Sequence, residues 1–173
     1  VAADTTALDA SEWGLTAAQV REVAEALPQL RCLRELVLDG VPVSGAPPRR
    51  GAFRYGVEPL DGDLEMFRAL CEALLACQAL TSLSLKMCWM GPQALALLAQ
   101  VVFRDASAAV ARLILTYNPL TGGNWNDFDK DITGVSALFD TLKTSSVTEL
   151  GLANCQLGPG SLAKLAEYLR EAT

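Results

Sequence analysis

A short leucine pattern recurs along this chain of 173 residues and narrows the folds that it can adopt. The pattern Leu-x-x-Leu-x-Leu, with at most one Val in place of Leu, occurs at residues 33–38, 80–85, 110–115 and 147–152. A degenerate fifth copy opens the chain, because residues 8–27 match residues 150–169 at one constant shift in five apolar positions. The central leucines lie 28, 47, 30 and 37 residues apart. Periods of this size indicate a solenoid, in which each repeat is one supersecondary unit stacked on its neighbours.

One position in each repeat marks a turn after the predicted strand. It lies three residues beyond the last Leu of the pattern and is occupied by Val41, Cys88, Asn118 and Cys155. An Asn side chain, and more weakly a Cys thiol, can bond to backbone groups at a buried turn, whereas Val cannot. We therefore expect the second repeat to have a remodelled turn.

An apolar helical pattern follows each strand. Its members are spaced as i, i+3 and i+7, which places them on one face of a helix. The sets are Val20, Val23 and Leu27; Phe67, Leu70 and Leu74; Leu95, Leu98 and Val102; Val135, Leu138 and Leu142; Leu162, Leu165 and Leu169. Asp63 and Asp131 precede their helices in the same Asp-x-Asp-apolar sequence, and both are predicted to be N-caps.

The consensus Leu-x-x-Leu-x-Leu-x-x-Asn/Cys-x-Leu, with a basic unit of 28 residues, resembles the ribonuclease-inhibitor-like class of leucine-rich repeat proteins. The resemblance implies an α/β fold, a right-handed horseshoe with five parallel strands on its concave side and five helices on its convex side. Strands need about 5 Å each and helices about 10 Å, so the stack curves. The class includes the ribonuclease inhibitor, the GTPase-activating protein of Ran and the sensor ends of NOD-like receptors, so the resemblance implies no single function.

We expect one leucine-rich repeat domain over residues 1–173, as a piece of a longer chain, because the last repeat is a clean consensus without a polar cap. Its repeats are predicted at residues 5–32, 33–79, 80–109, 110–146 and 147–173. The two longest repeats carry insertions between strand and helix, at residues 44–62 and 121–130. Exposed terminal repeats are adhesive, so we also expect a homotypic contact through them.

The composition disfavours several function classes. The chain has no His, which removes His-based acid/base catalysis and the common zinc sites. Its net charge of −6 disfavours nucleic acid as a partner, and no apolar run reaches the roughly 18 residues of a membrane span. The five cysteines form no C-x-x-C pair, which favours reduced thiols and a cytoplasmic location. We therefore expect a protein that is not an enzyme, has no cofactor or metal, and binds neither nucleic acid nor membrane.

The sequence Asp127-x-Asp129-x-Asp131 resembles the start of a calcium loop. A complete loop of that kind would have Gly and Glu where Ile132 and Leu138 stand, so the match fails. Helix capping is the preferred interpretation of these carboxylates.

Candidate protein-binding residues fall into two groups. Those on the predicted concave face are Lys86, Arg112, Tyr117 and Glu149. Those in the insertions are Arg49, Arg50, Phe53, Arg54, Tyr55, Trp125 and Phe128. Aromatic packing and opposite charges are expected to bring the two insertion loops together over the third repeat. The alternatives are a solvated sheet face and loop aromatics that pack back on the sheet edge.

The function predicted from these features is that of a non-catalytic scaffold or recognition module for protein–protein interaction. It would bind another protein through the concave sheet face and the two insertion loops. The sequence has neither a phosphate-binding Gly-rich motif nor a nucleophile elbow. A regulatory domain acting on a GTPase or ATPase is the alternative, and a calcium-dependent adhesion or sensor piece is the second alternative.

Overall fold

The computed structural model describes residues 4–11, 13–45, 60–103, 109–122 and 127–171. Its strands are β1 (Ala7–Asp9), β2 (Glu35–Val37), β3 (Ser82–Ser84), β4 (Arg112–Ile114) and β5 (Glu149–Gly151). Its helices are α1 (Ala17–Ala26), α2 (Leu64–Ala76), α3 (Pro92–Val102), α4 (Thr133–Leu142) and α5 (Pro159–Glu171), with a short 3-10 helix η1 (Leu27–Gln29) after α1. One strand and one α-helix therefore fall within each of the five expected repeats.

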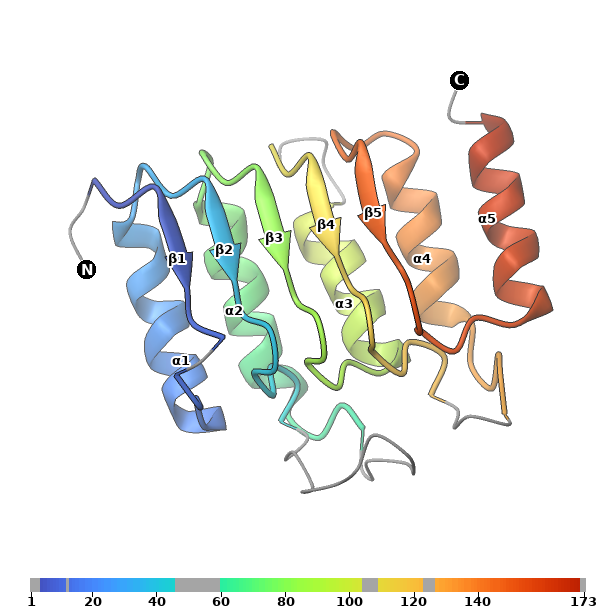
Figure 1. The fold of residues 1–173 in the computed structure, drawn as a ribbon, viewed down its shortest axis with the longest axis horizontal. Helices are drawn as coiled ribbons and strands as arrows, with labels where there is room; N and C mark the ends of the chain where they lie inside the picture. The colour runs from blue at the N-terminus through green and yellow to red at the C-terminus, as the bar shows by residue number, and fades with distance from the viewer. Residues whose placement is uncertain (1–3, 12, 46–59, 104–108, 123–126, 172–173) are drawn as a thin grey trace.

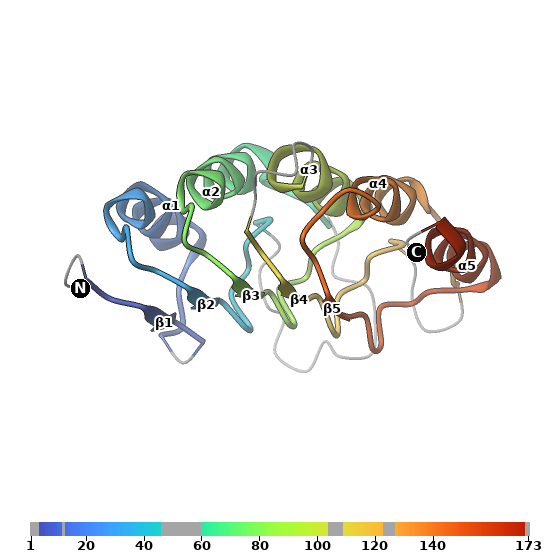
Figure 2. The same ribbon diagram turned by 90° about the horizontal axis from the view of Figure 1, so that it is seen from above.

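The strands form one parallel sheet whose spatial order follows the chain, β1-β2-β3-β4-β5. The sheet lines the concave side of the molecule and the helices line the convex side (Figure 1, Figure 2). Pairing aligns the central leucines of the motif in one row, namely Leu8, Leu36, Leu83, Leu113 and Leu150. The predicted right-handed leucine-rich horseshoe is confirmed, and its register is the one that the repeated motif predicts.

The apolar core lies between the sheet and the helices and is most completely closed in the middle repeats. Leu36, Leu83 and Leu113 are 0% exposed, whereas Leu8 and Leu150 in the outer strands are half-buried. The difference arises because an outer repeat has a neighbour on one side only. Stacking thus provides the burial that a single strand-turn-helix unit cannot achieve by itself.

Local signals specify where several helices begin. At α1 the Thr16 hydroxyl accepts a hydrogen bond from the Gln19 N–H, and the Gln19 side chain accepts one from the Thr16 N–H at 2.9 Å, which is a capping box. Helix α3 begins with Pro92, whose missing N–H is not needed at that position. None of the helices within the described residues is long and apolar enough to cross a membrane.

Asn118 holds the turn after β4 through three buried hydrogen bonds. Its amide nitrogen donates to the carbonyls of Leu85 at 2.7 Å and Leu115 at 2.8 Å, and its amide oxygen accepts from the Met90 N–H at 3.1 Å. Two of these partners belong to the preceding repeat. The Asn side chain therefore joins two repeats as well as closing its own turn.

At the turn positions occupied by Cys, the thiol replaces the Asn amide as a weaker donor. Its acceptor is again the carbonyl of the last motif leucine in the preceding repeat. The Cys88 thiol donates to the Leu38 carbonyl of the preceding repeat at 3.1 Å, and the Cys155 thiol donates to the Leu115 carbonyl at 3.1 Å. Both cysteines are buried. These bonds explain why either Asn or Cys can occupy the turn position, because both side chains donate a hydrogen bond to the preceding repeat.

The turn at Val41 has the same backbone hydrogen bond as the turn at Asn118 and differs from the turns at Cys88 and Cys155, where the following residues Trp89 and Gln156 adopt positive φ. The Val43 N–H donates to the Val41 carbonyl at 2.8 Å, as the Leu120 N–H donates to the Asn118 carbonyl at 2.9 Å. The Val41 N–H also donates to Leu38 at 3.1 Å. Gly40, with φ of 75°, adopts the left-handed conformation at no steric cost, and Met87, Tyr117 and Asn154 adopt the same conformation in the later repeats.

Burial makes four of the five cysteines poor nucleophiles. Cys71, Cys77, Cys88 and Cys155 are buried and unpaired, while Cys32 is exposed. Desolvation raises the pKa of the Cys155 thiol to about 11 and also raises the pKa of Cys88.

We therefore expect iodoacetamide to alkylate Cys32 alone in the native protein. The thiolate is the reactive form, and burial suppresses both its formation and its access to the reagent. Peptide mass spectrometry after brief labelling measures each site. Urea should make all five cysteines equally reactive, and native labelling of Cys88 as fast as that of Cys32 would contradict the assigned turn.

Candidate protein-binding face

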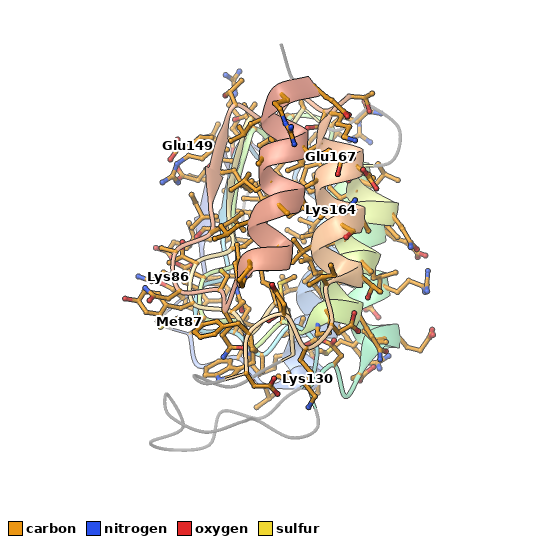
Figure 3. The ribbon with its side chains drawn as sticks, turned by 90° about the vertical axis from the view of Figure 1, so that its right-hand side faces the viewer. Lys86, Met87, Lys130, Glu149, Lys164 and Glu167 are labelled. Atoms are coloured by element: carbon orange, nitrogen blue, oxygen red, sulfur yellow. The ribbon has the colours of Figure 1, made fainter. Side chains whose placement is uncertain are left out.

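The concave face is built from the side chains that alternate with the core leucines. Strand pairing places Glu35, Ser82, Arg112 and Glu149 in one row across four strands. Because the backbone of the sheet is fixed by its register, these side chains have fixed spacing along the row. Figure 3 shows Lys86, Met87 and Glu149 on this side of the molecule, away from the helices.

Lys86 and Tyr117 form a contact across the ends of two neighbouring strands. The Lys86 ammonium lies 5.9 Å from the centre of the Tyr117 ring, within the range of a cation–π interaction. Tyr117 is 44% exposed although it is a large aromatic side chain. Its φ of 62° is the left-handed conformation that one residue also adopts after β2, β3 and β5. The pair presents one positive charge beside an open aromatic surface.

Arg112 and Glu149 form an ion pair at the start of β4 and β5, at the other end of the strands from Lys86 and Tyr117. The Arg112 Nε lies 2.9 Å from the Glu149 carboxylate, and the side chains are 45% and 58% exposed. An ion pair this exposed contributes only about 0–1 kcal/mol to stability. Its main effect is to hold two opposite charges at a fixed position on the concave face.

Two acidic residues, Asp9 in β1 and Asp39 just after β2, are held by hydrogen bonds. The Asp39 carboxylate accepts from the Ser84 hydroxyl at 2.5 Å and from the Lys86 N–H at 3.0 Å. The Asp9 carboxylate accepts from the Ser11 hydroxyl at 2.6 Å, and this bond holds the pKa of Asp9 below its usual value. The face is thus acidic over β1 and β2, and its positive charges lie over β3 and β4.

The structure brings together only part of the predicted set. Lys86 contacts Tyr117, and Arg112 contacts Glu149, as their positions on adjacent rungs predict. The aromatic and basic residues Arg49, Arg50, Phe53, Arg54, Tyr55 and Trp125 lie outside the described residues. Phe128 is 50% exposed and lies against Gly158, beside the start of α5 rather than on the concave face.

Asp63 is the N-cap of α2, as predicted. Its carboxylate accepts from the Met66 N–H at 2.8 Å, and this bond is the main reason that the pKa of Asp63 lies below its ordinary value. The Arg21 guanidinium of the preceding helix also donates to it at 2.9 Å.

Asp131 differs from this prediction by one residue. Helix α4 begins at Thr133, so Ile132 is its N-cap. The Asp131 carboxylate instead accepts from the N–H of Thr133 at 2.9 Å and from its hydroxyl at 2.6 Å. The Asp131 carboxylate therefore forms a local turn with Thr133 just before the helix instead of capping its first turn.

The first Asp of each Asp-x-Asp sequence has a role that the sequence interpretation missed. Asp61 accepts from the N–H groups of Gly91 at 2.8 Å and Gln93 at 2.9 Å, at the start of α3 in the next repeat. A Cβ at residue 91 would lie 2.5 Å from the Asp61 carboxylate, so this contact requires glycine there. The end of the first insertion thus caps the helix that follows its own.

Asp129 repeats the arrangement at α5. Its carboxylate accepts from the N–H groups of Gly158 at 2.9 Å and Gly160 at 2.7 Å, and from both the N–H and the hydroxyl of Ser161. The described end of the second insertion therefore contacts the fifth repeat, and the described end of the first insertion contacts the third. The signal in the sequence was the recurrence of Asp-x-Asp with a Gly at the next helix start.

Both carboxylate oxygens of Asp129 already accept hydrogen bonds from backbone N–H groups. This carboxylate therefore serves as a helix cap and is not arranged as a metal ligand. Burial opposes its ionisation, but the bonds from Ser161, Gly158 and Gly160 outweigh that effect and hold its pKa below the usual value. Within the described residues no group of three or more acidic or Cys side chains is placed to hold a metal ion.

The architecture is that of a leucine-rich repeat domain of the ribonuclease-inhibitor-like type. No protein-family model matches the chain, and no curated protein sequence matches it. Solved structures share its fold, among them the following two. The chain resembles the actin-binding site 2 of leiomodin-1 with a TM-score of 0.63 and 13% identity, over 96% of this chain and 80% of that one. It resembles the tropomodulin C-terminal domain of Caenorhabditis elegans with a TM-score of 0.61 and 11% identity, over 98% and 86%.

Proposed function

We propose that this domain is a non-catalytic module that binds another protein through its concave face, with Lys86 and Tyr117 at the centre of the contact. The observation that carries this proposal is the 44% exposed Tyr117 ring beneath the Lys86 ammonium, on a rigid sheet. Aromatic and cationic side chains of this kind dominate binding energy at protein interfaces. The two insertion loops form the second half of the proposed surface, where Trp125 is the residue to test.

The polar groups of the concave face suit recognition better than chemistry. Arg112 is paired with Glu149, and Asp39 is bonded to Ser84, so these groups are already oriented by neighbours. A partner that offers a carboxylate to Lys86 and an apolar side chain to Tyr117 would be complementary. We also propose a reducing, cytoplasmic setting, because the buried thiols are unpaired in this fold.

Actin is the first partner to test, because a similar solved structure is an actin-binding site of leiomodin-1. At 13% identity the likeness concerns the fold, so binding must be measured directly. Titration with monomeric actin and co-sedimentation with filaments cover both forms of the candidate partner. Failure to bind either form would exclude actin as the partner of this face.

We expect the combined change Lys86→Ala and Tyr117→Ala to weaken binding of the partner at least about tenfold, as loss of a central contact does. Isothermal titration calorimetry measures the effect. The matched control is Glu65→Ala with Arg68→Ala on α2, where both side chains are exposed on the convex side. Equal affinity for the double variant and the control would show that the partner binds elsewhere.

A further inference from the structure

The side chains midway along the strands form one row across the concave face, which we call the middle row. Strand pairing aligns its members, which are Asp9, Val37, Ser84, Ile114 and Gly151. Val37 and Ile114 are half-buried, and the Ile114 Cδ1 atom would lie 2.9 Å from a Cβ at residue 151, so Ile114 leans over this glycine. The middle row is therefore acidic at β1, where Asp9 is exposed, and short and uncharged from β2 to β5.

A row of longer side chains flanks the middle row at the amino ends of the strands. It contains Glu35, Ser82, Arg112 and Glu149. Arg112 and Glu149 neutralise each other at 2.9 Å, and Glu35 adjoins the exposed Arg34 in the chain. Opposite charges thus lie close together in this row, so it gives a charged partner little preference for one position over another.

The charges near the carboxyl ends of the strands are separated instead. Asp39 and Lys86 lie two residues beyond β2 and β3, and backbone bonds extend the register there, since the Gly40 N–H donates to the Lys86 carbonyl at 2.8 Å. The Asp39 carboxylate accepts from the Lys86 N–H, and the Lys86 ammonium lies over the Tyr117 ring. Within the described residues neither Asp9 nor Lys86 takes part in an ion pair. The face therefore presents carboxylates over β1 and β2 and an ammonium over β3.

The spacing of the strands matches the pitch of an α-helix. Neighbouring strands lie about 4.8 Å apart, and one helical turn rises about 5.4 Å, so a helix laid across the sheet can face one strand with each turn. From β1 to β3 the distance is about 10 Å, close to the rise of about seven helical residues. Figure 2 shows the strands side by side along the concave side in this order.

An extended peptide fits the same face less well. Its side chains on one face recur about every 6.6–6.8 Å, which does not match the spacing of the strands. Added strands bind at sheet edges, where backbone groups are free, but β2, β3 and β4 each pair on both sides. The concave face therefore favours a helix, whose backbone groups are already paired within the helix.

The width of the face also suits one helix. The amino and carboxyl rows are four residues apart along a strand, as Ser82 and Lys86 are, which is about 13 Å. A helix with its side chains is about 10–12 Å across. Figure 3 shows Glu149 and Lys86 on the concave side near opposite ends of the sheet, so a helix over the middle row would lie between them.

We propose that the concave face binds one amphipathic α-helix of a partner protein, laid across the strands over the middle row. A basic side chain of this helix faces Asp9, an acidic side chain about two turns away faces Lys86, and apolar side chains between them contact Val37 and Ile114. Apolar anchors at helical spacing are the usual way in which a helix binds to a protein surface. The inference rests on the proposed function, to which it adds the form of the bound segment and the order of its charges.

Selection of displayed helical peptides against the full chain tests the proposal. The probes are alanine-based peptides of about 20 residues with one helical face randomised. We expect the enriched peptides to have a basic and an acidic residue about seven positions apart, and to lose binding when a central residue is changed to Pro. They should also bind at least about tenfold more weakly to the Lys86→Ala, Tyr117→Ala double variant.

Charge reversal assigns each contact of an enriched peptide. Changing its acidic residue to Lys should weaken binding at least about tenfold, and Lys86→Glu in the protein should restore it. Changing its basic residue to Glu should be compensated by Asp9→Lys and not by Lys86→Glu. Glu65→Lys and Arg68→Glu on the convex side are the matched controls and should restore neither. Thermal melting checks that each variant folds, and the Lys86 arm decides the test if Asp9→Lys does not fold.

The outcomes separate this inference from the proposed function. Peptides that require Lys86 and Tyr117 but tolerate Pro, or show no compensation by Lys86→Glu, would overturn the helix and leave the concave face as a protein-binding surface. Peptides that bind the Lys86→Ala, Tyr117→Ala variant as tightly as the parent would count against both. A library that yields no binder would also overturn the helix proposal, while the proposed function is still judged by the partner titrations.

Discussion

Replacing Asn118 by Ala should lower the free energy of unfolding by about 3–4 kcal/mol, because it removes three buried hydrogen bonds at once. The change leaves the Met90 N–H and the Leu85 carbonyl without these partners inside the protein, and each unsatisfied buried group costs about 1–3 kcal/mol. For a chain of this size the melting temperature should fall by about 10 °C. Urea unfolding followed by circular dichroism measures the free energy.

Asn118→Cys distinguishes the hydrogen bonds from simple loss of volume. A thiol at this position can donate to the preceding repeat, as Cys88 and Cys155 do, but it does not replace the acceptor for Met90. Its cost should therefore be intermediate, about 1–2 kcal/mol. A loss below about 1 kcal/mol for Asn118→Ala would show that the turn does not depend on this side chain.

Asp129→Ala should destabilise the protein by about 2–3 kcal/mol, with the loss concentrated in the last repeat. The carboxylate caps α5 through Gly158, Gly160 and Ser161, and it also fastens the second insertion to that helix. Asp61→Ala removes two such bonds and should cost about half as much. Amide hydrogen exchange should show faster exchange in α5 for Asp129→Ala and in α3 for Asp61→Ala.

The exposed Asp127 provides the control for these two changes, since Asp127→Ala should stay within about 0.5 kcal/mol of the parent. The depressed pKa of Asp129 also fixes a pH dependence. Its stabilisation is present above the unfolded-state pKa of about 3.9 and is lost as pH falls through the lower folded-state pKa. The stability difference between the parent and Asp129→Asn should hence be constant from pH 7 to about pH 5 and shrink below about pH 4. A difference that grows on acidification would refute the assignment.

The fold was predictable because every copy of the leucine pattern must bury the same apolar side chains against a neighbouring copy. Each Leu-x-x-Leu-x-Leu segment needs the same neighbours, so one register satisfies all five strands, and Leu36, Leu83 and Leu113 are aligned as the pattern predicts. The contact of Lys86 with Tyr117 follows from the same register. Conversely, Leu162 and Leu169 match buried residues in the pattern but are exposed, because within the described residues α4 alone among the helices packs against α5.

The capping contacts between repeats were not predictable from the same reasoning. Asp61 and Asp129 bind the helix of the next repeat, and the local sequence around each carboxylate does not contain that helix start. The periodic pattern predicts where the apolar side chains lie. It does not predict the contacts of the insertions, which differ in length and lie outside the pattern. The recurrence of Asp-x-Asp was visible, yet its first carboxylate binds a glycine 29 or 30 residues further along the chain, which a local rule does not consider.

Photo-cross-linking from the concave face tests the central claim most directly. A benzophenone amino acid placed at residue 117, in place of the exposed Tyr117, would capture whatever protein the face binds in a cell extract. The matched probe replaces Gln100, which is exposed on α3 on the convex side. We predict that one protein dominates the products from residue 117, that it is absent from those of residue 100, and that adding Lys86→Ala reduces its yield. The same products from both positions, or none from residue 117, would contradict the proposal that this face recognises a protein partner.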